Sequence, residues 1–318
     1  MPERIAEFDL IERIRRRAGA RDDVVLGIGD DAALLQVPAG RHLVVAMDTL
    51  NAGVHFPHDT APADIGWKAL AVNLSDLAAM GAEPAWCTLS LSMPAADETW
   101  VDAFLDGFGA LASQYRVALV GGDTTRGPLS VCVTVHGFVE PGRALRRDGA
   151  CVGDLVWVSG TLGDAAAALP HVLDGTAVDA SLRARLDRPT PRIALGRALT
   201  GVATACIDVS DGLLADAGHI AEASCVGIEV EVDALPMSSH VAGLDASLRR
   251  RCQATGGDDY ELCFTAPAAT TPSVHRAAMA SGTAVTCIGR VVAGRGVVAV
   301  DGDGAAWTPP HAGHVHFA

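Results

Sequence analysis

The sequence is poor in positive charge and contains a single lysine. Its 318 residues carry 24 Lys and Arg against 38 Asp and Glu, which gives a formal net charge of −14. Proteins that bind nucleic acid usually have the opposite balance, because Lys and Arg make the contacts with phosphates. A P-loop needs lysine in a G-K-[ST] motif, but the only lysine, Lys68, lies between Trp67 and Ala69. We therefore expect no nucleic-acid partner and no P-loop nucleotide site.

Long apolar runs and closely spaced cysteine pairs are also missing. No run reaches the roughly 18–20 apolar residues that span a bilayer, and residues 1–19 are rich in Arg and Glu, unlike a signal peptide. None of the eight cysteines stands in a C-x-x-C motif, which argues against a zinc ribbon. Most cysteines lie in apolar runs, which is typical of buried thiols in a reducing compartment. We expect a cytoplasmic protein that does not cross a membrane.

Length and pattern predict two domains of mixed helix and strand. Hydrophobic residues make up 49% of the chain and charged residues 19%, which is typical of a folded protein. The chain is too long for one ordinary core, and β-rich and helical segments occur on both sides of a polar, Gly-rich stretch at residues 143–153. We predict an α/β (α+β) fold with an N-terminal domain over residues 1–145 and a C-terminal domain over residues 146–318.

Acidic residues recur where predicted strands end. Each single instance is typical of a turn residue or a helix cap, but the repeated placement presents carboxylates at a sheet edge, where α/β proteins gather ligands. Carboxylate oxygens suit Mg²⁺, and a cation is needed if phosphates are to lie beside several carboxylates. The strand-end acids are Asp30 with Asp31, Asp48, Asp123, and Asp208 with Asp211.

One further acid, Asp76, interrupts an apolar helix that we predict over residues 63–80. An isolated charge is costly to bury. Asp76 therefore either faces solvent on a narrow polar stripe with Asn73 or binds a cation.

Three other features are ambiguous on the sequence alone. Residues 27–32 match G-x-G-x-x-A, but a dinucleotide-binding turn must open a helix, and a hairpin fits the following residues better. Arg146 and Arg147 lie beside the expected domain boundary, where they either clamp a phosphate or form a solvated turn. His55 follows a strand end, and a lone histidine is more often structural than functional.

These motifs occur together in a known family. The sequence resembles the thiamine-monophosphate kinases, within a superfamily that includes aminoimidazole ribonucleotide synthetase and selenophosphate synthetase. The matching segments follow the family order and span nearly the whole chain. They are residues 27–34, 47–56, 68–82, 119–128, 208–213 and 257–262.

The resemblance implies a fold and a reaction. The fold would be that of aminoimidazole ribonucleotide synthetase, with an N-terminal domain whose β-sheet pairs with its twin in a homodimer and a C-terminal α/β domain. The reaction would be a direct, Mg²⁺-dependent transfer of the ATP γ-phosphoryl group to thiamine monophosphate, which gives thiamine diphosphate. The acceptor phosphate is already an anion, so no catalytic base is expected, and positioning and metal electrostatics would carry the reaction.

The resemblance also implies roles for individual residues. Several Mg²⁺ ions would be held by Asp30, Asp48, Asp76, Asp123, Asp208 and Asp211. ATP would contact Gly121, Gly122, Asp123, Arg147 and Ser210. Thiamine monophosphate would contact His55 and the segment that contains Asp258 and Asp259.

Three positions depart from the family pattern. Met47 stands where the family often has Ser or Thr, so a metal contact there must come from its backbone oxygen. Asp258 replaces a glutamate and is one carbon shorter. His314 takes the place of an aromatic residue that packs on thiamine, and Trp307 is the nearest large aromatic that could substitute.

Two alternatives remain beside the kinase. One is a sister synthetase, although the first cysteine is Cys87, far from the N-terminal position of the reactive residue in selenophosphate synthetase, and the chain lacks the terminal cysteine of the hydrogenase-maturation relative. The other is a non-catalytic nucleotide- or ion-binding module. The complete set of carboxylates argues against such a module, because a catalytically dead relative would tolerate losses there.

Overall fold

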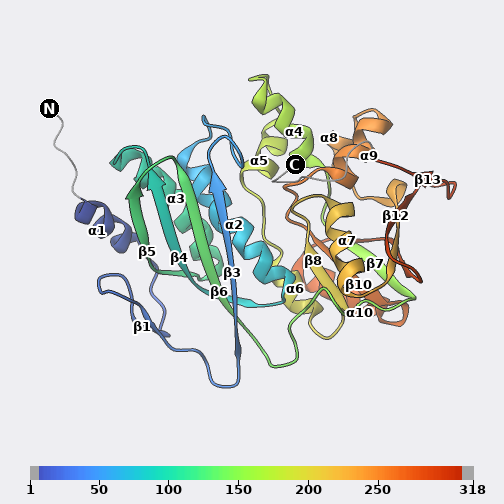
Figure 1. Ribbon diagram of the computed structural model, residues 1–318, viewed down its shortest axis with the longest axis horizontal. Helices are drawn as coiled ribbons and strands as arrows, with labels where there is room; N and C mark the ends of the chain where they lie inside the picture. The colour runs from blue at the N-terminus through green and yellow to red at the C-terminus, as the bar shows by residue number, and fades with distance from the viewer. Residues whose placement is uncertain (1–6, 310–318) are drawn as a thin grey trace. The chain divides into compact units, whose positions relative to one another are not determined.

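The computed structural model describes residues 7–309, and the chain divides into two compact units. The first unit comprises residues 1–77 and 83–141, and the second comprises residues 78–82 and 142–318. The short segment 78–82 belongs to the second unit, where the N–H of Leu145 donates to the carbonyl oxygen of Met80 at 3.1 Å. Both units mix helices with a sheet (Figure 1), which confirms the predicted two-domain α/β (α+β) fold. The structural division falls after residue 141, whereas the sequence placed it after residue 145.

A four-stranded sheet in the order β3-β6-β4-β5 forms the frame of the first unit (Figure 1). Strands β4 and β5 pair in parallel, and the other two pairings are antiparallel. Helix α1 and the small β1-β2 hairpin complete this unit. The elements are α1 (Glu7–Arg17), β1 (Val24–Leu26), β2 (Leu34–Leu35), β3 (His42–Asn51), α2 (Pro62–Ala79), β4 (Glu83–Met93), α3 (Glu98–Tyr115), β5 (Ala118–Arg126) and β6 (Ser130–Val139).

Helix α2 is apolar on nearly all sides, as expected of a helix in the interior. It packs tightly against α3, because glycines stand at the crossing. A Cβ atom at Gly66 would lie 2.1 Å from the carbonyl oxygen of Phe104, and one at Gly107 would lie 1.8 Å from that of Ala63. Backbone-to-backbone contact of this kind excludes any larger residue at either position.

The sheet of the first unit keeps apolar side chains exposed along its edge strand β3. Val45 and Met47 are 54% and 62% exposed. They lie on the same face of the sheet as His136 and Thr134, their register partners on β6. This face therefore presents both apolar and polar side chains at the surface of the chain.

The second unit is built on a seven-stranded sheet in the order β13-β12-β9-β11-β7-β10-β8. All neighbouring strands are antiparallel except β12 and β9. The strands are β7 (Asp154–Ser159), β8 (Ala205–Asp208), β9 (Gly227–Glu231), β10 (Leu262–Pro267), β11 (Val285–Val292), β12 (Gly296–Val300) and β13 (Ala306–Trp307). The helices are α4 (Asp164–Leu173), α5 (Ala180–Asp187), α6 (Ile193–Leu199), α7 (Leu213–Ala223), α8 (Ser239–Ala242), α9 (Ala246–Thr255) and α10 (Thr271–Ser281).

Alternating side chains of β7 pack on opposite faces of this sheet. Val156 and Val158 belong to the cluster that also buries the apolar side of α7. Trp157, between them, stacks on Phe264 of β10 and meets His275 of α10 edge-on, with ring centroids 5.5 Å apart. The sheet is therefore covered on both faces, and its strands are correspondingly apolar.

Two strands run further than the sequence indicated. We expected Asp48 to end its strand and Asp123 to follow its strand, but β3 continues to Asn51 and β5 to Arg126. Parallel pairing with β4 carries β5 through the glycines, and Asp123 is the register partner of Ser90. Glycine has low strand propensity, so the sequence alone underestimates a strand that its neighbour completes.

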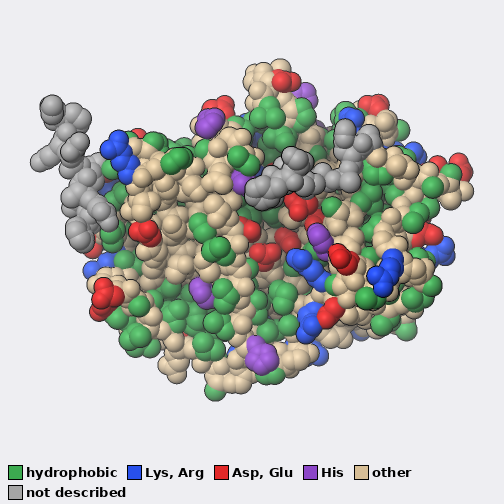
Figure 2. Space-filling model, in the orientation of Figure 1, with side chains coloured by type: hydrophobic (Ala, Val, Ile, Leu, Met, Phe, Trp, Pro, Cys, Tyr) green, Lys and Arg blue, Asp and Glu red, His purple; other side chains and the backbone are tan. Residues whose placement is uncertain are grey.

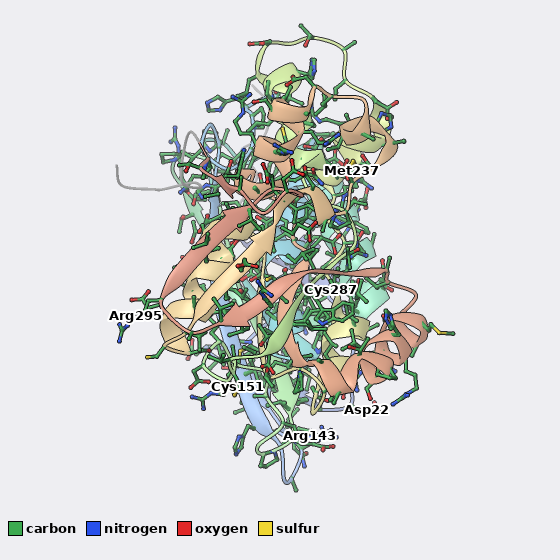
Figure 3. All side chains as sticks on the ribbon, turned by 90° about the vertical axis from the view of Figure 1, so that its right-hand side faces the viewer. Asp22, Arg143, Cys151, Met237, Cys287 and Arg295 are labelled. Carbon is green, nitrogen blue, oxygen red and sulfur yellow. The ribbon has the colours of Figure 1, made fainter. Side chains whose placement is uncertain are left out.

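The cysteines are less uniformly buried than we expected. All eight are free, and Cys151, Cys225 and Cys287 are exposed; Figure 3 labels the first and the last.

On the face shown in Figure 2, basic side chains are scattered among acidic ones. Across residues 7–309, no helix is both long and apolar enough to span a membrane.

Candidate functional site

The turn between β8 and α7 carries three of the predicted residues. Asp208 ends β8 and is 6% exposed, and Ser210 and Asp211 follow it, both partly exposed. Gly212 then opens the helix with a φ of 115°, a conformation that side chains rarely allow. A Cβ atom there would also lie 2.8 Å from the backbone of Thr255. The turn is therefore tight, and it presents Ser210 and Asp211 toward the surface.

A second loop, residues 257–261, is hydrogen-bonded along this turn. The N–H of Asp258 donates to the carbonyl oxygen of Ser210 at 2.9 Å, and the N–H of Tyr260 donates to that of Val209 at 2.8 Å. Asp258 and Tyr260 have φ values of 67° and 50°. Such left-handed backbone is unfavourable for these residues and clusters at functional sites. The structure thus joins the predicted metal-binding turn to the predicted substrate-binding segment.

The two aspartates of that segment have different surroundings. Asp258 is partly exposed, and its Oδ1 accepts a hydrogen bond from the Tyr260 hydroxyl at 2.9 Å. Asp259 is 2% exposed, and both of its oxygens accept from the N–H of Gly163, at 3.0 and 3.1 Å. Burial raises the pKa of Asp259 well above its usual range. Of the two carboxylates, that of Asp258 is the one within reach of a ligand.

The sequence placed Glu261 in the segment expected to contact thiamine monophosphate, but not as the buried residue that supports this loop. Its side chain is fully buried and accepts from Arg185 at 2.9 Å, from Arg192 at 2.7 Å and from the Ser159 hydroxyl at 2.6 Å. Two arginines compensate a charge that would otherwise be very costly to bury. The signal in the sequence was a single Glu directly before the apolar run of β10. Its role could not be predicted, because its partners lie far away in the sequence.

Asp216 of α7 is a second residue that the sequence did not single out. It is 2% exposed, and its Oδ2 accepts from the backbone N–H groups of Ser210, Asp211 and Gly212, at 3.0, 3.1 and 3.1 Å. Burial, followed by the neighbouring charges of Asp208 and Asp211, raises the pKa of Asp216 to about 7. Asp216, like Asp76, is an acid in a largely apolar helix. The same argument, that an isolated charge is costly to bury, would have singled it out.

Arg147 lies beside β8 and near the C-terminal end of α7, where its carbonyl oxygen accepts from the Ser224 hydroxyl at 2.8 Å. The Cys206 N–H of β8 donates to the carbonyl oxygen of Arg146 at 2.8 Å, so this segment runs beside β8. Burial raises the pKa of the Cys206 thiol, Asp208 raises it further, and Arg147 lowers it. The exposed guanidinium of Arg147 and the carboxylate of Asp208 therefore lie near one buried thiol. Arg146 instead pairs with Asp148, at 2.8 and 2.5 Å.

Trp307 lines a pocket within the second unit. The pocket has an empty volume of about 980 Å³, part of it open to solvent. Leu214 and Thr255 also line it, and both are next to the turn at Gly212. Trp307 therefore lies in a pocket that borders this turn. His314 lies outside the described residues.

In the first unit, Asn73 of α2 holds the backbone of Asp48. The side-chain oxygen of Asn73 accepts from the N–H of Asp48 at 2.8 Å, and its amide nitrogen donates to the carbonyl oxygen of Ala69 at 2.9 Å. Asn73 is fully buried, so the solvent-facing stripe considered for it is wrong. Asp76 follows one turn later on the same side of α2. It is the one residue of the range 68–79 that is not buried.

Gly121, Gly122 and Asp123 line another pocket of the first unit. Its empty volume is about 430 Å³, and Ile28, next to the turn that carries Asp30, also lines it. A Cβ atom at Gly122 would lie 1.8 Å from the carbonyl oxygen of Leu89, so only glycine fits. Asp30 is exposed, and its Oδ1 accepts the N–H of Asp31 at 2.8 Å. The structure thus brings the Asp30 turn and the Gly-Gly-Asp segment to one pocket.

His55 is oriented by the chain around it. Its Nδ1 accepts the N–H of Asn51 at 3.0 Å, so the neutral ring carries its proton on Nε2. Nζ of the buried Lys68 donates to the carbonyl oxygen of His55 at 3.3 Å. Met47 points away from Asp48, since successive residues of a strand face opposite sides.

The acidic residues suit a hard cation that binds with few protein ligands. Within residues 7–309, no three His, Cys, Asp or Glu side chains lie close enough together to hold a metal ion on their own. Mg²⁺ usually takes only one or two carboxylates and completes its shell with water and phosphate oxygens. The partly exposed Asp76 and Asp211 fit that pattern, because each leaves room for such ligands.

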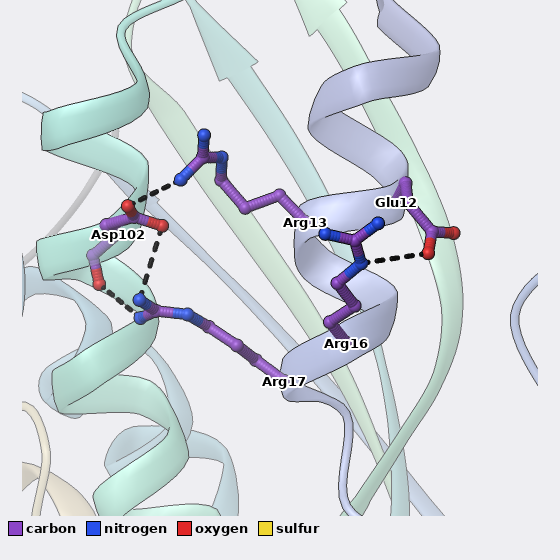
Figure 4. Close-up of a pocket in the computed structure, with 5 residues that line it drawn as sticks. All are labelled: Glu12, Arg13, Arg16, Arg17 and Asp102. Atoms are coloured by element: carbon purple, nitrogen blue, oxygen red, sulfur yellow. Dashed lines mark hydrogen bonds and ion pairs between the residues drawn. The ribbon is translucent and has the colours of Figure 1, made fainter.

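A pocket between α1 and α3 carries charged side chains but no motif residue. Arg13 and Arg17 both bind Asp102, at 2.6 and 3.3 Å, and Arg16 binds Glu12 at 3.1 Å (Figure 4). These arginines are thus paired with neighbouring acids. We interpret the pocket as a surface hollow, and the ion pairs with Asp102 as contacts that hold α1 against α3.

Two family models match the chain. The AIR synthase related protein N-terminal domain matches residues 29–139, and the corresponding C-terminal domain matches residues 152–302. The chain is therefore an AIR synthase related protein with both domains of that class.

Similar proteins of known activity identify the family within this class. The thiamine-monophosphate kinase of Salmonella typhimurium is 47% identical over 319 residues, 98% of each chain. The crystal structure of thiamine-monophosphate kinase from Stenotrophomonas maltophilia K279a matches with a TM-score of 0.87 at 57% identity, over 95% of this chain and 98% of that one. AaThiL complexed with AMPPCP and TMP matches with a TM-score of 0.78 at 34% identity over the whole of both chains. The chain belongs to the thiamine-monophosphate kinase family, which confirms the resemblance and makes it an ATP-dependent kinase.

Proposed function

We propose that this protein transfers the γ-phosphoryl group of ATP to thiamine monophosphate, giving thiamine diphosphate and ADP, with Mg²⁺ as the required cation. The observation that carries this proposal is the hydrogen-bonded pair of loops in the second unit. It joins Asp208, Ser210 and Asp211 to Asp258 within a chain 47% identical to a thiamine-monophosphate kinase. The AaThiL structure, which holds AMPPCP and TMP, supports the same pair of substrates.

ATP would bind without a P-loop. In the first unit, Gly121, Gly122 and Asp123 line a pocket that would receive part of the nucleotide. In the second unit, Ser210 lies in the turn after β8 and Arg147 lies beside β8, and the forked guanidinium of Arg147 suits a phosphate. Each unit thus offers its own set of groups to the nucleotide.

Carboxylates within each unit would hold Mg²⁺. Those of the first unit are Asp30, Asp48, Asp76 and Asp123, with the backbone oxygen of Met47, and those of the second are Asp208 and Asp211. Bound Mg²⁺ would neutralise charge on the phosphates. The protein groups themselves hold the reactants in line, and the anionic acceptor phosphate needs no base to remove a proton.

The thiamine end of the acceptor would contact groups of a different kind. Thiamine carries a positive thiazolium ring, which favours a carboxylate or an aromatic face. Asp258 offers a partly exposed carboxylate, and Trp307 lines the pocket beside the same turn. His55, with its proton on Nε2, offers a hydrogen-bond donor from the first unit. Asp259 would act from the interior, by holding Gly163.

An assay of ATP consumption against several acceptors tests the proposal. Purified protein with Mg²⁺ should consume ATP with thiamine monophosphate and release thiamine diphosphate. Free thiamine should be a poor acceptor, because it lacks the phosphate that receives the new bond. Equal rates with thiamine and its monophosphate would refute a phosphate acceptor. Consumption with an aminoimidazole precursor or selenide, and none with thiamine monophosphate, would assign the protein to a sister reaction.

A further inference from the structure

The turn that follows β8 has its backbone donors already occupied. Three consecutive N–H groups, those of Ser210, Asp211 and Gly212, converge on one carboxylate oxygen of Asp216 at 3.0 to 3.1 Å. Successive N–H groups at a strand-to-helix turn form a concave anion site, which commonly receives a phosphate. Here the fourth residue of α7 fills that site from inside the protein. The turn therefore has to meet its ligands through its side chains.

The opposite side of the turn is also fixed. The carbonyl oxygens of Val209 and Ser210 accept from the N–H groups of Tyr260 and Asp258, at 2.8 and 2.9 Å. Two parts of the protein thus hold the turn. The loop that contains Asp258 and Tyr260 binds its carbonyl oxygens, and Asp216 binds its three N–H groups. Without it, three donors inside the protein would lack an acceptor, and the turn would have to move to find water.

We propose that Asp216 is a positioning residue, whose carboxylate stands in for an anion beneath the turn and so holds Ser210 and Asp211 in the geometry that binds nucleotide and cation. This inference rests on the function proposed above. It differs from an ordinary helix cap in a measurable way. A cap contributes to stability alone, whereas a positioning residue affects the reaction while the fold persists.

The test compares two variants of Asp216 with one matched control. Asp216→Ala removes the acceptor, and Asp216→Asn retains one oxygen without the charge. Asp154→Asn is the control, because Asp154 is also a buried carboxylate of the second unit, 4% exposed, that accepts a backbone N–H, from Cys151 at 3.0 Å. Asp154 has no contact with the turn among the hydrogen bonds found in residues 7–309.

We expect Asp216→Ala to lower kcat by roughly 10²-fold, since a small displacement of positioned groups has an effect of that order. The KM for ATP and the Mg²⁺ concentration for half-maximal rate should rise as well. Asp216→Asn should be intermediate. Asp154→Asn should lower the unfolding temperature and leave these kinetic constants within twofold of wild type. Formate, which can occupy the emptied site, should restore part of the rate of Asp216→Ala and none of that of Asp216→Asn.

Hydrogen exchange gives a readout that needs no substrate. The amides of residues 210–212 should exchange faster in Asp216→Ala than in wild type, while those of β7 remain protected. If wild type fails to phosphorylate thiamine monophosphate, the proposed function is wrong, and the exchange of these amides still decides the role of Asp216. Unchanged protection of residues 210–212 would overturn the inference, as would kinetic constants of Asp216→Ala within twofold of wild type.

Discussion

Individual carboxylates of this protein act in ways that their sequence context does not distinguish. Glu261 is neutralised by two arginines, Asp216 is surrounded by backbone N–H groups, and Asp76 is left partly exposed on an otherwise buried helix. The carboxylates of Glu261 and Asp216 bind groups of the protein itself. Asp76 is the one whose carboxylate is partly exposed, and we propose that it binds Mg²⁺.

Substitution of Asp76 tests its proposed contact with Mg²⁺. We expect Asp76→Asn to keep the fold, since the amide is nearly the same size, and to lower turnover by roughly 10²- to 10³-fold, because cation electrostatics contribute several kcal/mol to such transition states. The measurement is kcat at saturating Mg²⁺ together with the thermal unfolding temperature. Asp64→Asn, in the first turn of the same helix, is the matched control. Near-normal turnover of Asp76→Asn would show that the metal role is wrong.

The β1-β2 hairpin illustrates how an element depends on a pair of charges. Asp23 accepts from Arg21 at 2.9 and 2.7 Å and from the indole N–H of Trp86 at 2.9 Å. Arg21 and Trp86 lower the pKa of Asp23 against the opposing effect of burial. These bonds join the start of the hairpin to β4, and Val24 and Leu35 of the hairpin pack against the buried cluster that includes Trp86.

The stability that Asp23 contributes should depend on pH. A lowered pKa in the folded protein means that the ionised form stabilises it. The contribution is therefore complete above the unfolded pKa of about 3.9 and is lost as the pH falls through the lower folded value. Denaturant unfolding of wild type and Asp23→Asn between pH 7 and pH 2 should show a difference that is largest above pH 4 and shrinks below it. A difference that stays constant with pH would contradict this assignment.

The contact between α2 and α3 allows a paired test of helix packing. Gly107→Ala would place a Cβ atom 1.8 Å from the backbone oxygen of Ala63 and should destabilise the protein by several kcal/mol or prevent folding. Gly109→Ala, two residues away on α3, meets nothing within 4 Å. It should be neutral or add about 0.5–1 kcal/mol, because alanine favours a helix. Denaturant unfolding measures both, and equal effects would refute the close approach of the two helices.

At the scale of the whole molecule, the exposed face of the four-stranded sheet in the first unit is a candidate interface with another protein chain. We propose that it pairs with a second copy in a homodimer, because Val45 and Met47 on β3 are among the exposed large apolar residues, and an uncovered edge strand favours pairing. Light scattering at micromolar concentration should give twice the 32.7 kDa of one chain. A purely monomeric mass would refute the dimer.

Substitutions on this face localise the interface. Val45→Glu places a charge among the apolar groups and should shift the protein toward monomer. Met279→Glu is the control, because Met279 is 84% exposed on α10 and belongs to the second unit, which does not contain the β3 sheet. If both variants, or neither, change the mass, the interface lies elsewhere.

The sequence by itself determined the features that depend on local chemistry. The apolar run of residues 68–80 fixes a buried helix, and the absence of a second lysine excludes a P-loop. Acidic turns after apolar runs predict where the site lies, and the order of the motifs along the chain pointed to the family that the comparisons confirm.

Only the tertiary structure decided the features that depend on distant partners. The length of β5 follows from pairing with β4, which carries it through two glycines that favour no strand. Asp258 and Asp259 are neighbours in the sequence, yet the fold exposes one and buries the other against Gly163. The role of Asp216 arises because the turn after β8 folds back over the first turn of α7 and brings three N–H groups to one oxygen. Such contacts form only when the chain is folded, since their energies depend on burial and on geometry that no local pattern encodes.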